Sequence, residues 1–129
     1  MREIKFRAWD ENRKKWVYFR LDEIVNINHE SLTDDEWAFI QLKNIGQYTG
    51  LKDKNGREIY EGDIVKGTGK NPIIYVVEWL DSYGGFAFVD KEKAIPAYEF
   101  LVNFCEVIGN IYENLELLEV GKDGKKGGL

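Results

Sequence analysis

The sequence predicts a mainly β fold in which several short strands build a small sandwich or barrel. Apolar and polar residues alternate with a period of two in several segments, and Gly, Asn and Asp recur between these segments, where turns are expected. The chain of 129 residues also holds four Trp, seven Tyr and seven Phe, which suit the half-buried faces of strands. This length corresponds to one domain with its own core.

An N-terminal hairpin is predicted from residues 4–9 and 16–19. The first segment alternates between an apolar face and a cationic, aromatic face, and the second carries Trp-Val-Tyr-Phe. The polar connection between them is too long for a two-residue turn. The cationic face carries Lys5, Arg7 and Trp9.

One helix start follows the hairpin. Thr33 and Glu36 have the spacing of a capping box, and Leu32 stands where it can pack on Trp37. We expect a short helix there, ended at the latest by Gly46.

From residue 47 onward the pattern is β throughout. Strands are expected over residues 47–49, 57–60, 64–65, 73–79, 86–89 and 106–113. The residues expected to shape the turns are Gly50, Asp53, Asn55, Gly56, Gly62 and Asp63. Pro96 is expected to break the chain, Gly109 and Asn110 to kink the last strand, and Asn114 to cap a terminal helical turn over residues 115–119.

Charge and cysteine content limit the function classes. The net charge of −5 works against non-specific binding of polyanions. Cys105 is the only cysteine and its neighbours are apolar, which predicts a buried thiol and a reducing compartment. No apolar run is long enough for a signal peptide or a membrane span, so we expect a cytoplasmic protein without membrane contact.

The sequence offers no catalytic constellation and predicts no cofactor. His29 is the only histidine and is interpreted as a solvated loop residue, and one Cys with one His cannot close a zinc site. Asp34, Asp35 and Glu36 could hold Mg²⁺ or Ca²⁺, but acids in a first helical turn also favour its positive end, and we prefer that interpretation. Spacings similar to a calcium loop and a phosphate loop, at residues 53–64 and 64–71, fail at essential positions.

Lys5, Arg7 and Trp9 form the candidate interaction surface. Exposed aromatic rings beside cations stack bases in single-stranded nucleic acid. The same residue types are enriched at protein interfaces, and we prefer an interface or fold packing for them.

Three blocks of the sequence resemble the YopX family of small phage and prophage proteins. They are residues 2–10 with Lys15 and Trp16, residues 47–65, and residues 106–114. The family usually places Pro after the last of these residues, where this chain has Leu115. The resemblance implies a small barrel similar to an SH3-type roll, preceded by the hairpin, in a protein encoded by a phage or prophage of a bacterial host. It implies no activity and no catalytic residue.

The expected domain spans residues 1–120, with a hairpin and helix region in 1–45 and a barrel-like region in 46–120. Residues 121–129 form a Gly- and Lys-rich tail that is expected to be flexible. We expect a non-catalytic module that binds a protein partner or assembles with itself. A nucleic-acid-binding small β-barrel is the alternative, and a carboxylate- or magnesium-dependent enzyme ranks last.

Overall fold

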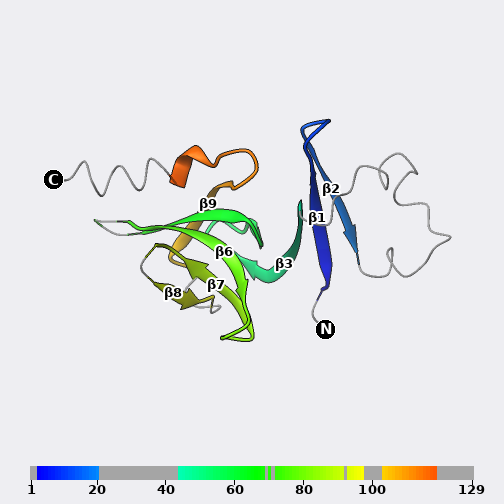
Figure 1. The fold of residues 1–129 in the computed structure, drawn as a ribbon. Coiled ribbons are helices and arrows are strands. Elements are labelled where there is room, and N and C mark those ends of the chain that lie inside the picture. Colours follow the sequence, from blue (N-terminus) through cyan, green and yellow to red (C-terminus); the bar gives the residue numbers. More distant parts are fainter. Residues whose placement is uncertain are drawn as a thin grey trace.

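The computed structural model describes residues 3–20, 44–68, 70, 72–91, 93–97 and 103–118. These residues form two antiparallel sheets, which confirms the prediction of a mainly β protein (Figure 1). The strands are β1 (Lys5–Asp10), β2 (Lys15–Arg20), β3 (Ile45–Lys52), β4 (Glu58–Tyr60), β5 (Asp63–Gly67), β6 (Ile74–Leu80), β7 (Gly85–Val89), β8 (Ala94–Pro96) and β9 (Cys105–Asn110). A helical turn over residues 116–118 follows β9.

The strand β3 connects the two halves of the molecule. One sheet has the order β2-β1-β3-β4 and the other the order β8-β7-β6-β5-β9. The β1–β2 hairpin stands beside the five-stranded sheet, and β3 leads from one toward the other (Figure 1). Within the described strands, no pairing closes either sheet into a barrel, so the expected SH3-type roll is not confirmed.

The first hairpin is held by the polar connection that the sequence indicated. β1 and β2 pair from Lys5 opposite Arg20 to Asp10 opposite Lys15. The carboxylate of Asp10 accepts hydrogen bonds from the backbone N–H groups of Asn12 and Arg13, both at 3.0 Å. A side chain that satisfies the backbone in this way stabilises a turn longer than two residues.

Asp53 organises the turn between β3 and β4 and ties it to β9. Its Oδ1 accepts from the backbone N–H groups of Asn55 and Arg57, both at 2.9 Å. Its Oδ2 accepts from the N–H of Val107 at 2.8 Å. Gly56 has a φ of 82°, in the left-handed region where only glycine is free of strain.

The main core lies between β4 and the five-stranded sheet. Its buried members are Ile59, Val65, Tyr75, Val77, Phe88, Cys105 and Val107. A second, smaller cluster on the hairpin consists of Ala8, Val17 and Phe19, with Phe6 and Ile45 packed against it. The buried thiol predicted at Cys105 is confirmed, and burial raises its pKa to about 11.

Pro96 ends the strand β8, which was not predicted and which lies at the edge of its sheet, where a residue without an N–H is tolerated. Two details of the predicted elements are wrong. The last strand ends at Asn110, because the Asn110 side chain accepts from the N–H groups of Tyr112 and Glu113 and turns the chain. The side chain of Asn114 does not cap the following turn but accepts from the N–H of Asn110 at 3.2 Å.

Several predictions fall outside the described residues. They are the helix near Thr33, His29, the acidic residues Asp34, Asp35 and Glu36, and the tail over residues 121–129. In the part of the chain that is described, no helix has the length and apolar character to cross a bilayer.

Candidate functional site

The structure buries two of the three residues of the candidate interaction surface. Arg7 and Trp9 are each 4% exposed, and Lys5 is half-buried. Arg7 on this face contacts the carbonyl of Glu61 and the carboxylate of Asp63, and Lys5 contacts Glu58, so the face takes part in packing within the chain. A period of two identifies residues that share a face, but it does not show what covers that face.

Arg7 forms a buried ion pair with Asp63 at the start of β5. The Nη2 atom of Arg7 lies 2.6 Å from Oδ1 of Asp63, and both side chains are almost fully buried. The second carboxylate oxygen of Asp63 accepts from the backbone N–H of Tyr60 at 2.8 Å. The pair therefore joins the N-terminal hairpin to the β4–β5 connection.

Aromatic rings enclose the guanidinium group of Arg7. Its Cζ atom lies 4.0 Å from the centroid of the Trp16 ring and 4.8 Å from that of Tyr60. Both distances are in the range of cation–π attraction. Burial raises the pKa of Asp63, and the nearby Arg7 guanidinium opposes this shift. Burial also raises the pKa of Tyr60, with a smaller contribution from Glu58.

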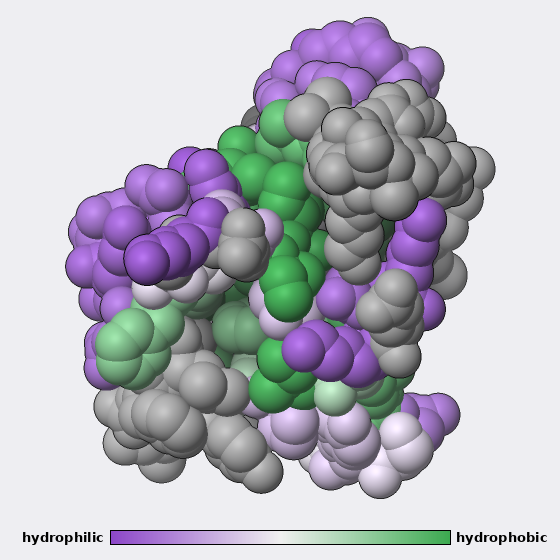
Figure 2. Space-filling view, turned by 90° about the vertical axis from the view of Figure 1, so that its left-hand side faces the viewer, coloured by the Kyte–Doolittle hydropathy of each residue, from purple (hydrophilic) through white to green (hydrophobic). Residues whose placement is uncertain are grey.

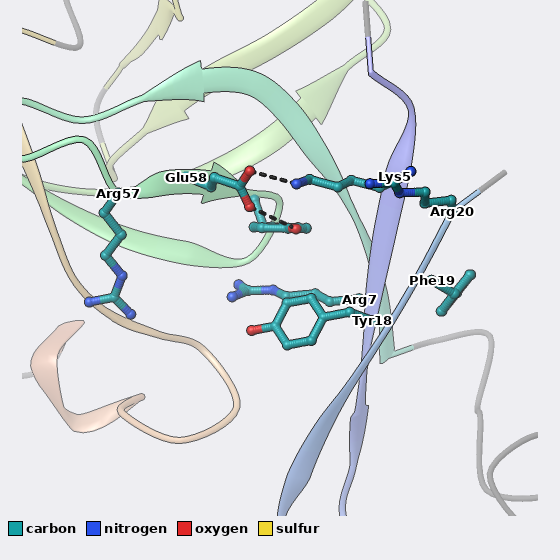
Figure 3. Close-up of a pocket in the computed structure, with 8 residues that line it drawn as sticks. Lys5, Arg7, Tyr18, Phe19, Arg20, Arg57 and Glu58 are labelled. Atoms are coloured by element: carbon teal, nitrogen blue, oxygen red, sulfur yellow. Dashed lines mark hydrogen bonds and ion pairs between the residues drawn. The ribbon is translucent and has the colours of Figure 1, made fainter. Parts of the chain in front are cut away.

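A groove of about 500 Å³ opens beside this ion pair, between the β1–β2 hairpin and β4 (Figure 3). It is lined by Lys5, Arg7, Tyr18, Phe19, Arg20, Arg57, Glu58 and Tyr60. The hydroxyl of Tyr18 is directed toward the wall that carries Arg57, while Phe19 lies on the other side of the hairpin (Figure 3). The Tyr18 ring contacts that of Tyr60 edge to face, with centroids 5.9 Å apart.

Four of the eight lining residues are cations, and two of these cations are balanced locally. Asp63 balances Arg7, and Glu58 lies 2.5 Å from Nζ of Lys5, where their hydrogen bond raises the pKa of Lys5. Arg20 is 63% exposed at its side chain, and its one ion pair to a described residue is a 3.5 Å contact with Glu3. Arg57 is exposed and has no ion pair within 4.0 Å among the described residues. The positive charge that remains for a ligand is thus on Arg57 and on Arg20, whose pair with Glu3 is long and exposed to solvent.

The sequence pattern was sufficient to predict which residues form one wall of this groove. Cross-strand pairing places Tyr18 opposite Arg7 and Arg20 opposite Lys5, so these residues of β2 share the cationic face of β1. No local pattern indicated the other wall, because Arg57 and Glu58 meet the hairpin only through tertiary structure.

The structure shows two further surface features. Apolar surface forms a band between hydrophilic regions on the side of the molecule that faces left in Figure 1 (Figure 2). A second hollow of about 390 Å³ is lined by Ile45, Glu61, Gly62, Val76, Val77, Glu78, Ile111 and Tyr112. Over the described ranges, no group of three or more His, Cys, Asp or Glu side chains is arranged to hold a metal ion.

Fold and groove together define a small, mainly β protein that carries a cationic and aromatic groove between its N-terminal hairpin and the strand β4. A family model described as "YopX protein" matches residues 5–119, and the chain belongs to the YopX family. This confirms the resemblance seen in the sequence blocks.

Among solved structures, the chain is similar to the crystal structure of protein EF1440 from Enterococcus faecalis. The TM-score is 0.63 and the sequence identity 28%, over 92% of this chain and 99% of that chain. Comparison with the curated proteins finds no match. Neither the family description nor the name of the structural neighbour states an activity.

Proposed function

We propose that the chain is a non-catalytic module that binds another protein through the groove between β1, β2 and β4. The observation that carries this proposal is the placement of Arg20 and Arg57 on the two walls of one groove, with charge that no groove carboxylate balances. Tyr18, with 56% of its surface exposed, adds an aromatic ring between them. Arg and Tyr are enriched among the residues that carry most of the binding energy at protein interfaces.

The ordered floor of the groove supports the same proposal. The floor contains Arg7 and Tyr60, which the buried ion pair and the ring contacts hold in place. A surface that is ordered before binding loses less conformational entropy on association. The partner is either a second copy of this chain or another protein.

Site-specific photo-crosslinking in bacterial cells tests the proposal. A photoreactive phenylalanine analogue replaces Tyr18 in one variant and Tyr83 in the control variant. Tyr83 is a suitable control because it is 47% exposed in the β6–β7 turn and does not line the groove. We expect a discrete covalent adduct from position 18 only, and its loss when Arg57→Glu is added.

Light scattering after size exclusion shows whether the adduct partner is a second copy. If position 18 gives no adduct and the protein is a monomer, the proposed function is wrong. The same adducts from positions 18 and 83 would also contradict it, because they would show that the protein is crosslinked through random collisions and not through the groove.

A nucleic-acid-binding small β-barrel is the second candidate, favoured by the same cations beside Tyr18. Against it stand the net charge of −5 and the small number of unbalanced cations in the groove. Titration with labelled single- and double-stranded oligonucleotides at low salt tests it, since affinity must fall steeply as salt rises. A carboxylate- or magnesium-dependent enzyme ranks last, because acids such as Asp34, Asp35 and Glu36 in an expected first helical turn also favour the positive end of that helix.

The type of β fold, the extent of the domain, the origin of the protein and its location in the cell are also proposals. An SH3-type roll is supported by the backbone hydrogen bond from the N–H of Gly62, in the β4–β5 connection, to the carbonyl of Val77 in β6 at 2.8 Å. A single domain over residues 1–120 is supported by the Arg7–Asp63 pair, which crosses the boundary between the regions 1–45 and 46–120. The family resemblance supports a phage or prophage origin, and the single buried thiol supports a cytoplasmic location.

A further inference from the structure

We infer that the partner presents an acidic, extended peptide segment to the groove, an inference that rests on the proposed function. One carboxylate of the segment pairs with Arg57, a second pairs with Arg20, and an apolar or aromatic side chain between them packs on the ring of Tyr18. Three features of the groove favour this ligand: the type of its hydrogen-bond donors, their placement and the carboxylates beside them.

The available donors are guanidinium groups. Arg7 forms an ion pair with Asp63, and Lys5 forms one with Glu58, so the charge of neither residue is available to a ligand. A guanidinium group presents paired N–H donors that match the two oxygens of a carboxylate. The groove therefore favours carboxylates, at the positions of Arg20 and Arg57.

The two donors lie on different walls. Arg20 ends β2, and Arg57 directly precedes β4, with the Tyr18 ring in the space between them (Figure 3). A small single anion cannot engage both walls and also cover the ring. An extended chain with spaced acidic side chains can do both.

Carboxylates of the protein disfavour a denser polyanion. Glu58 lines the groove and Glu3 contacts both Lys5 and Arg20, so negative charge stands beside the cations. A nucleic-acid strand carries a charge at every nucleotide and gains most of its affinity from many phosphate contacts. A peptide with two spaced carboxylates avoids these glutamates, and a nucleic-acid strand does not.

Fluorescence anisotropy with defined probes tests the inference. The probe is a labelled, capped peptide of alternating Asp and Tyr. The comparison probes are a capped peptide of alternating Lys and Tyr and a labelled oligothymidine. We expect only the Asp-containing peptide to bind at physiological salt.

Two charge reversals provide the matched variants. Arg57→Glu is expected to weaken binding of the acidic peptide about tenfold or more, because a charge-assisted pair becomes a repulsion. Lys70→Glu makes the same change of charge at an exposed residue outside the groove and is expected to change binding by less than about twofold. Thermal unfolding of both variants checks that they fold, and Arg57→Ala replaces the reversal if Arg57→Glu does not.

The outcomes separate the inference from the proposed function. Equal binding of the acidic and basic peptides, or equal effects of the two charge reversals, overturns the acidic-segment inference. Tighter binding of oligothymidine that Arg57→Glu abolishes replaces it with the nucleic-acid alternative. If no probe binds while the adduct at position 18 remains and depends on Arg57, the groove binds a protein by other chemistry. If the adduct is absent as well, the inference and the proposed function both fail.

Discussion

Replacement of Asp63 by Asn is expected to destabilise the protein by about 3 kcal/mol. The two carboxylate oxygens have separate partners, since Oδ1 accepts from Arg7 at 2.6 Å and Oδ2 accepts from the N–H of Tyr60 at 2.8 Å. An Asn side chain has only one oxygen, so it leaves either the buried guanidinium or the buried amide without an acceptor. Removal of one partner from a buried pair costs about 3–5 kcal/mol, and the rings around Arg7 favour the lower end. For a chain of this length, the melting temperature falls by roughly 10 °C.

Urea unfolding followed by tryptophan fluorescence measures this loss. A double-mutant cycle with Arg7→Met isolates the pair, because Met keeps an apolar stem between the Trp16 and Tyr60 rings. We expect the double variant to be about 2 kcal/mol more stable than the sum of the single effects predicts. A cost below about 1 kcal/mol for Asp63→Asn, or additive single effects, would refute the assigned role of the pair.

Three further predictions concern packing and ionisation. Gly46→Ala is expected to cost about 1–3 kcal/mol, because its Cβ would stand 2.7 Å from the backbone oxygen of Glu61. Gly85→Ala, with no atom within 4 Å of the added Cβ, should leave the melting temperature almost unchanged, and equal effects of the two would contradict this account. Burial raises the pKa of Tyr60 above its ordinary value of 10.0, so above pH 10 the phenol ionises more readily in the unfolded chain than in the folded protein. The free energy of unfolding is therefore unaffected by this group below pH 10 and decreases as the pH rises above 10. Tyr60→Phe should flatten part of that fall in urea titrations across pH, and an unchanged slope would disprove the link. Cys105, with a pKa of about 11 and 4% exposure, should react with iodoacetamide only as fast as the protein opens, whereas equal rates in native protein and in urea would show an accessible thiol.

Local turn chemistry made much of the fold predictable. Asp53, Asn55 and Gly56 combine a side chain that accepts backbone N–H groups with a residue that adopts positive φ, and this combination works over a few residues without tertiary contacts. The β1–β2 hairpin was readable for a similar reason, because alternation and a polar connection are both local. The strand β8 was missed because three residues ending in Pro carry no periodic signal, and their pairing with β7 supplies the order.

The candidate site was only partly predictable. Alternation correctly placed Lys5, Arg7 and Trp9 on one strand face, and the register of a hairpin would have added Tyr18 and Arg20. The pattern could not show which distant part of the chain contacts this face. At β1 both faces are covered, since one packs on the apolar cluster and the other meets Asp63, whereas Tyr18 and Arg20 of β2 stay exposed beside the groove.

The four groove cations show why residue type alone does not locate a binding surface. Arg7 is balanced by a carboxylate 56 residues away and Lys5 by one 53 residues away. Both therefore serve to join the hairpin to β4 and β5, and substituting either one changes stability before it changes binding. Arg20 and Arg57 have the same chemistry in the sequence, but no described residue forms a buried ion pair with either of them, so their charge remains available. A substitution that weakens binding without lowering the melting temperature is accordingly expected at Arg20 or Arg57 and not at Arg7 or Lys5.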